Sequence, residues 1–174
     1  MAQISAAALK VFSEEGFDKA SIRLIAKEAN IALGLLYNYF PSKEALLESL
    51  LRTCLQEALF LHVSEEERAK LTLKDFIQQL VKKVKLNRDS WKLYFSLRFQ
   101  TSTTKEINEM MQEEVEYTLQ VLEHYLAEEA IPFPSLEAKF IWASLSGLIG
   151  QLLLEKNYPL DDMAHLLILK YERK

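Results

Sequence analysis

The sequence predicts an all-α protein, with an N-terminal helix-turn-helix unit and a larger helical region after it. Apolar residues recur at three- and four-residue spacing through most of the 174 residues, which is the period of amphipathic helices. The chain has only four Gly and four Pro, and the clearest helix breakers lie at residues 131–134 and 157–159, between helical segments. No alternating strand pattern or internal repeat competes with this prediction.

The helix-turn-helix pattern lies between residues 21 and 47. Ser21 is a favourable N-cap for a short helix whose apolar stripe leaves Arg23 on the exposed side. Asn30 tolerates the left-handed conformation that ends a helix. We therefore expect this helix to end before a tight turn at residues 30–32.

A second short helix is predicted over residues 33–39, and a third helix starts at Ser42. About two turns of helix are marginal in isolation, so the second helix must be held by a neighbour and used for its surface. That surface carries Tyr37, Asn38 and Tyr39.

Four segments in this order resemble the N-terminal DNA-binding domain of the tetracycline-repressor (TetR) family of bacterial transcription regulators. They are residues 4–17 with their glycine stop, 25–29 in the second helix, 34–40 (GLLYNYF) in the recognition helix, and 41–46 at the entry to the fourth helix. Several matches at these spacings are more specific than one short pattern. The resemblance covers roughly residues 2–55, and beyond it only the family's all-helical habit is visible.

The resemblance implies a homodimeric repressor that binds double-stranded DNA at a palindromic operator and is released by a small apolar or aromatic effector. It implies a DNA-binding domain over residues 1–46 and an effector-binding and dimerisation domain over residues 47–174. Tyr37 and Tyr39 are expected to contact phosphates, and Lys43 to neutralise one. The expected DNA-binding set is Ser21, Arg23, Leu33, Gly34, Leu35, Tyr37, Asn38, Tyr39 and Lys43, in which Asn38 and residues 33–35 read bases.

Four positions depart from the family pattern. Asn30 stands where the family usually has Gly. Ala32 stands where the family has Ser or Thr, and it has no side-chain oxygen to cap the recognition helix. Leu35 replaces a small hydroxyl residue, so it cannot bind a phosphate but can touch a thymine methyl group. Leu24 replaces an acidic residue near the start of the second helix. These departures keep open an alternative, an all-helical carrier or sensor of apolar ligands that has lost DNA binding.

The charge balance is acidic. Residues 1–60 have seven acidic side chains against six basic ones, namely Lys10, Lys19, Arg23, Lys27, Lys43 and Arg52, and the whole chain has a net charge of −4. DNA binding would therefore depend on a few locally placed cations and backbone N–H groups. The same balance argues against coating of nucleic acid or membranes, and no apolar run reaches membrane-spanning length, so we expect a cytoplasmic protein with no membrane partner, at the nucleoid when bound to DNA.

The remaining helices follow from periodicity and breakers. They are expected over about residues 43–63, 73–86, 90–99, 105–129, 135–156 with Ser135 as the cap, and 160–171, with an exposed charged linker at 64–68.

The helix over 135–156 is apolar on more than one face, and its small residues permit close approach of another helix. With the last helix it is expected to form a two-fold dimer interface through Ser144, Gly147, Leu148, Met163 and Leu167. Burial within the monomer is the alternative.

Aromatic residues gather in the middle of the chain. An apolar pocket with a few polar groups suits a small-molecule effector, and Met adapts to different shapes. By analogy with the family we expect this pocket to be lined by Trp91, Tyr94, Phe95, Met111 and Tyr117. The alternative for each of these residues is a place in the core.

No catalytic or cofactor motif is visible, so we expect neither an enzyme nor a cofactor. His62, His124 and His165 have no second ligand at helical metal spacing, which predicts no metal site. Cys54 is the only cysteine and lies on an apolar helical stripe, which predicts a core position in preference to redox sensing.

Overall fold

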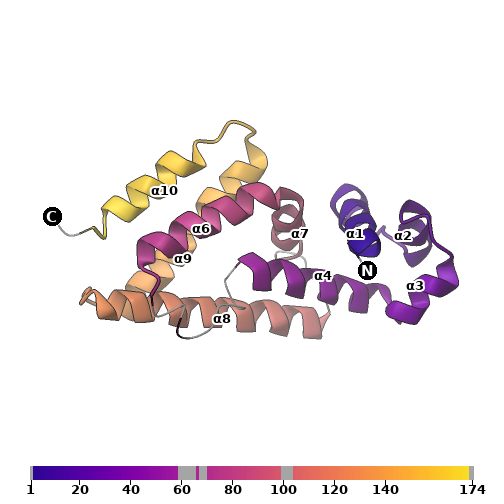
Figure 1. The fold of residues 1–174 in the computed structure, drawn as a ribbon, viewed down its shortest axis with the longest axis horizontal. Coiled ribbons are helices and arrows are strands. Elements are labelled where there is room, and N and C mark those ends of the chain that lie inside the picture. Colours follow the sequence, from indigo (N-terminus) through magenta and orange to yellow (C-terminus); the bar gives the residue numbers. More distant parts are fainter. Residues whose placement is uncertain (1, 59–65, 67–69, 99–103, 173–174) are drawn as a thin grey trace. The chain divides into compact units, whose positions relative to one another are not determined.

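The structure is a computed structural model that describes residues 2–58, 66, 70–98 and 104–172 (Figure 1). The described residues form helices without strands, which confirms the all-α prediction. The helices are α1 (Ala2–Glu15), α2 (Ile22–Glu28), α3 (Leu33–Tyr39), α4 (Lys43–Ala58), α6 (Leu73–Leu86), α7 (Arg88–Arg98), α8 (Lys105–Glu128), α9 (Pro134–Leu154) and α10 (Leu160–Leu169). No described helix is long and apolar enough to cross a membrane.

The chain divides into two compact units. Unit 1 comprises Met1–Gln56 and Asn87–Met111, and unit 2 comprises Glu57–Leu86 and Gln112–Lys174. This division by packing differs from the predicted boundary after residue 46, which separates the expected DNA-binding domain from the expected effector-binding domain. That boundary stays a prediction.

Local signals at the start of unit 1 act as the sequence predicts. Gly16 ends α1 with a φ of +79°, where a side chain would be strained, and Asn30 adopts a φ of +51° after α2. The Ser21 hydroxyl accepts a hydrogen bond from the Leu24 N–H at 3.1 Å and so caps α2. Ala32 precedes α3 without a side-chain cap, as expected.

The core of unit 1 holds these short helices in place. α1 and α2 lie side by side (Figure 1), with Phe12 of α1 and Ile25 of α2 fully buried. Leu36 anchors α3 in the same way. Burying one such side chain contributes about 1.5–3 kcal/mol, which helps to hold a seven-residue helix that would not form alone.

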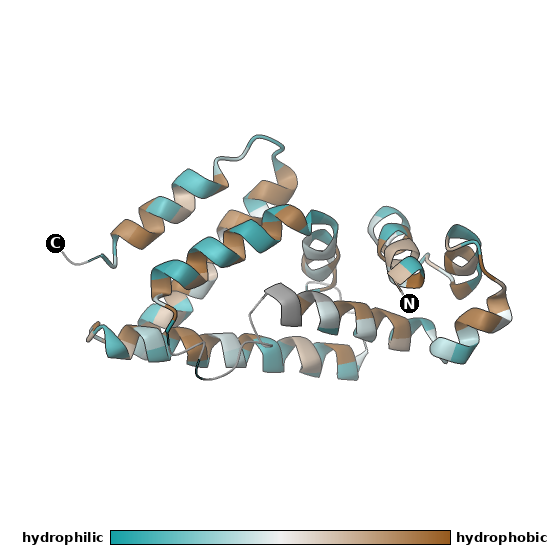
Figure 2. Ribbon diagram, in the orientation of Figure 1, coloured by the Kyte–Doolittle hydropathy of each residue, from teal (hydrophilic) through white to brown (hydrophobic). Residues whose placement is uncertain are grey.

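Unit 2 is built from α6, the greater part of α8, α9 and α10. Hydrophobic and hydrophilic bands alternate along α6 and α10 in Figure 2, and α10 packs against both α6 and α9. The last described turn of the chain also binds both neighbours, because the Tyr171 hydroxyl donates to Glu137 Oε2 at 2.6 Å and Lys74 Nζ pairs with Glu172 at 2.9 Å.

One predicted helix boundary is wrong. Ser135 was expected to cap the helix over 135–156, but α9 begins at Pro134 and its N-cap is Phe133, which has a φ of +56° and makes no side-chain cap. Proline is well suited to the first turn of a helix because its ring presets φ. Of the expected helix over 43–63 the structure describes residues 43–58. Except for Glu66, the linker at 64–68 lies outside the described residues, and so does the side chain of Cys54.

Candidate nucleic-acid interface

Helix α3 is buried on one side only. Leu36 is fully buried, whereas Leu35, Tyr37 and Tyr39 are 43%, 50% and 51% exposed. Gly34 and Asn38 are exposed as well, and Leu33 is half-buried. Folding of this helix does not require these exposed side chains, so they are available for contact with a partner.

A hollow in unit 1 lies beside this surface. It is formed by the start of α2, by α3 and by the turn into α4, and its lining is Ala20, Ser21, Ile22, Arg23, Leu33, Tyr37, Pro41, Ser42 and Lys43. Five of the nine residues predicted to bind DNA therefore line one hollow. The lining includes two cations and no carboxylate, a charge pattern that suits a phosphate group.

Hydroxyl groups at the hollow are engaged in helix capping. Ser42 Oγ accepts a hydrogen bond from the Ala45 N–H at 3.0 Å at the start of α4, as Ser21 does for α2. Free N–H groups in the first turn of α4 add partial positive charge at this rim. Tyr37 and Arg23 have no partner among the described residues and can therefore meet a ligand without breaking a contact.

Lys43 has a role that sequence reasoning missed. Its ammonium donates to the Phe17 carbonyl at 2.7 Å and to the Asp18 carbonyl at 3.5 Å, and it lies 4.2 Å from the centroid of the Phe17 ring. The sequence pattern places Lys43 correctly at the start of a helix, but no local signal relates it to a turn 26 residues earlier. Its expected phosphate contact stays a prediction.

The predicted effector-pocket residues fall in both units. In unit 1, Trp91, Tyr94 and Met111 are buried. The ring centroids of Trp91 and Tyr94 lie 5.6 Å apart, and those of Tyr94 and Phe95 lie 5.5 Å apart. Tyr117 is half-buried in unit 2. None of the hollows described here is lined by these side chains, so the pocket stays a prediction.

The predicted dimer residues share one groove of unit 2. The groove runs between α9 and α10, and its lining is Phe140, Ala143, Ser144, Gly147, Leu148, Gln151, Tyr158, Met163, Leu166, Leu167 and Lys170. Two large apolar side chains on it, Phe140 and Leu166, are 52% and 54% exposed. All five residues predicted for the interface belong to this lining, although Leu167 is itself buried within the monomer.

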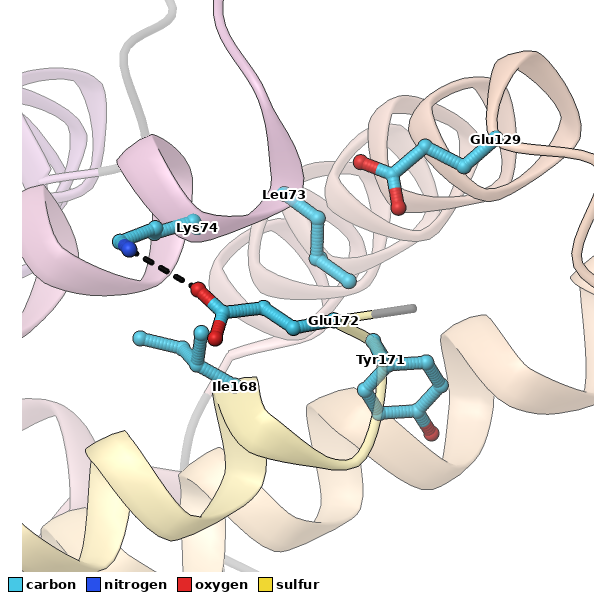
Figure 3. A pocket seen from close by; sticks show the side chains of 6 residues that line it. All are labelled: Leu73, Lys74, Glu129, Ile168, Tyr171 and Glu172. Carbon is cyan, nitrogen blue, oxygen red and sulfur yellow. Dashed lines mark hydrogen bonds and ion pairs between the residues drawn. The ribbon is translucent and has the colours of Figure 1, made fainter. Parts of the chain in front are cut away.

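A further hollow lies at the end of unit 2 (Figure 3). Leu73 and Ile168 form its buried apolar part, while Glu129, Tyr171 and the ion pair of Lys74 with Glu172 surround it. Sequence reasoning did not identify it, since its residues come from three distant segments. Across the described ranges, no group of three His, Cys, Asp or Glu side chains is placed to hold a metal ion.

Comparison with known proteins agrees with this geometry. Residues 4–50 match the family model of bacterial regulatory proteins of the tetR family. The HTH-type transcriptional regulator YuxN of Bacillus subtilis (strain 168) is 54% identical over 44 residues, which are 25% of this chain and 15% of that protein. The fatty acid metabolism regulator protein of the same strain is 34% identical over 82 residues, 47% of this chain and 41% of that protein. The alignments thus span less than half the length of these curated relatives.

The fold is also similar to solved structures. The fatty acid degradation regulator FadR from Bacillus halodurans superposes with a TM-score of 0.78 over 95% of this chain and 93% of that chain, at 23% identity. These findings confirm the TetR resemblance. The matched proteins are regulators rather than enzymes, in agreement with the expectation for this chain.

Proposed function

We propose that this chain is a helix-turn-helix transcriptional regulator of the TetR family, a homodimeric repressor that a small apolar or aromatic effector releases from a palindromic operator. The observation that carries this proposal is the one-sided burial of α3 beside a cationic hollow. A surface of this kind matches a recognition helix in the major groove with phosphates of the flanking backbone in the hollow.

The contacts divide into positioning and reading. Tyr37 and Arg23 line the hollow and bind phosphate oxygens, which fixes the register of the protein on DNA. Exposed Asn38 and Leu35 face base edges, where an amide can pair with adenine and an aliphatic side chain can touch a thymine methyl group. Tyr39 contacts a phosphate and can also reach a base edge.

Dimerisation through the α9–α10 groove is supported by its exposed apolar lining. A two-fold interface presents the same patch on both subunits, and Gly147 and Ser144 allow two helices to approach closely. A dimer is also what a palindromic operator requires, because one short recognition helix reads few bases.

The effector is proposed to be apolar. The aromatic cluster of Trp91, Tyr94 and Phe95 supports this class, and the indole N–H of Trp91 is buried without a partner among the described residues. One relative by sequence is a fatty acid metabolism regulator, so fatty acids are the first compounds to test.

A carrier of apolar ligands without DNA binding is the second candidate, favoured by the missing side-chain cap at Ala32. A gel shift with the DNA that flanks its own gene separates the two. A regulator gives a discrete complex that survives competitor DNA, whereas the absence of any specific complex across that region would favour the carrier.

A further inference from the structure

The ammonium group of Lys43 is held inside unit 1. It lies at the first residue of α4, and its bond to the Phe17 carbonyl reaches back to the turn between α1 and α2. The side chain is half-buried, and the Phe17 ring lies beneath the charge at 4.2 Å. These three contacts restrict the Lys43 side chain far more than the side chain of an exposed lysine without contacts is restricted.

The turn that Lys43 binds is held by backbone and apolar contacts, and Lys43 adds a link to α4. It includes Gly16 at a positive φ, and a backbone bond runs across it from the Ala20 N–H to the Gly16 carbonyl at 3.1 Å. The Phe17 and Ala20 side chains are buried. The carbonyls of Phe17 and Asp18 follow the C-terminal end of α1, where a positive charge is favourable. The residue after this turn is Ser21, which caps α2 and lines the cationic hollow.

We propose that Lys43 is a positioning residue for DNA recognition: its ammonium ties the α1–α2 turn to the start of α4 and so sets the width of the hollow between α2, α3 and α4, instead of pairing with a phosphate itself. This inference rests on the proposed DNA binding of the chain. It assigns direct phosphate contact to Arg23, the other cation of the lining.

Two variants of the full chain test the assignment. Lys43→Met keeps the alkyl stem over the Phe17 ring and removes the three donors, while Arg23→Met removes an exposed cation from the same hollow. Affinity for the flanking-DNA duplex is measured at 25 °C across a salt series, and hydrogen exchange is followed at the Ala20 amide. Lys43→Gln, which keeps a neutral donor, replaces Lys43→Met if the latter does not fold.

We expect Lys43→Met to lower affinity about tenfold with an unchanged salt slope and to speed exchange at Ala20. We expect Arg23→Met to leave exchange unchanged and to reduce the slope by about 0.9, the value for one lost phosphate contact. A slope reduced by Lys43→Met with unchanged exchange would make Lys43 a phosphate ligand and overturn the proposal. Faster exchange with wild-type affinity would also overturn it, because Lys43 would then be structural only.

Failure of the proposed function gives a different result. If the wild-type chain forms no specific complex with the duplex, DNA binding is refuted whatever the variants do. Exchange at Ala20 then still decides the structural half of the inference, and an unchanged rate in Lys43→Met would refute that half too.

Discussion

At the scale of single residues, the two phenol rings of α3 lie largely outside the core. Aromatic side chains contribute most when buried, yet Tyr37 and Tyr39 leave about half of their surface in solvent, while Leu36, the residue before Tyr37, anchors the helix. Their hydroxyl groups have the length and the donor capacity to reach phosphate oxygens.

Tyr37→Ala is expected to weaken operator binding by about 1–3 kcal/mol through loss of a phosphate contact. The midpoint of thermal unfolding should change little, since the side chain is exposed. Fluorescence anisotropy with a labelled duplex measures the affinity, and Tyr37→Phe is the matched control that separates the hydroxyl from the ring. Wild-type affinity in Tyr37→Ala would remove this residue from the interface.

In unit 2, the environment of the Tyr171 hydroxyl predicts how the stability of the protein depends on pH. Burial and then the hydrogen bond to Glu137 raise the pKa of its phenol above the ordinary value of 10.0. A raised folded-state pKa means that the stabilisation is fully present below the unfolded-state value and is lost as pH rises through the folded-state value. The stabilisation by Tyr171 is therefore expected to decrease as the pH rises above about 10.

Tyr171→Phe is expected to cost roughly 1 kcal/mol of unfolding free energy at pH 8, less than the ~1.5–3 kcal/mol of a buried charge-assisted bond because the group is partly exposed. Above pH 10 the advantage of the wild type should shrink, since its unfolded chain releases the Tyr171 proton and the variant cannot. Urea unfolding of both chains at pH 8, 10 and 11 measures the difference. A difference independent of pH would show that the hydroxyl does not have this environment.

At the scale of helices, α9 and α10 bury one side in the monomer and leave an apolar groove on another. Leu145 and Leu167 are buried, so they contribute to the core, although Leu167 also lines the groove. Phe140 and Leu166 on the groove are exposed. Substitution of Leu167 would therefore test folding, whereas substitution of Phe140 tests assembly.

Phe140→Glu is expected to convert a dimer to monomers, because it places two charges in an apolar two-fold interface. Sedimentation velocity measures the change, and operator binding should be lost with the dimer. Leu86→Glu is the matched control, since Leu86 is 70% exposed on α6 and lies outside the groove. A dimer that persists in Phe140→Glu would place the interface elsewhere.

At the scale of the whole molecule, control requires that effector and operator prefer different arrangements of the chain. Helix α4 starts at the cationic hollow and ends close to the point where the chain passes into unit 2. A ligand that shifts α4 can therefore change the spacing of two recognition helices in a dimer. By linkage, the operator must weaken effector binding by the same factor.

Under the proposed function, a fatty acid effector is expected to weaken operator binding by about 1–3 kcal/mol, and saturating operator should weaken the binding of the fatty acid equally. The chain has two Trp, so a Trp142→Phe variant reports on Trp91 alone. Its fluorescence should change on effector binding if the ligand lies beside the cluster of Trp91, Tyr94 and Phe95. Binding without any effect on operator affinity would leave a ligand site with no regulatory role.

The sequence by itself determined the features that depend on near neighbours. Helix periodicity, the Ser21 cap, the positive φ of Asn30 and the absence of a cap at Ala32 are all set within about four residues, so their signals are visible in the chain. The family pattern over the first 50 residues belongs to the same class, because it is a set of local signals in a fixed order. The predicted cap of α9 was wrong, because the expected capping residue, Ser135, follows a proline that already starts the helix.

Only the tertiary structure decided which distant residues meet. The contact of Lys43 with Phe17 spans 26 residues and that of Tyr171 with Glu137 spans 34, and neither pair has a signature in sequence spacing. Whether an apolar residue of α9 or α10 fills the core or lines the groove likewise depends on which face a neighbouring helix covers. Periodicity identifies the apolar residues of a helix, but burial is a property of the packed molecule, and so the groove and the contacts of Lys43 are visible only in the fold.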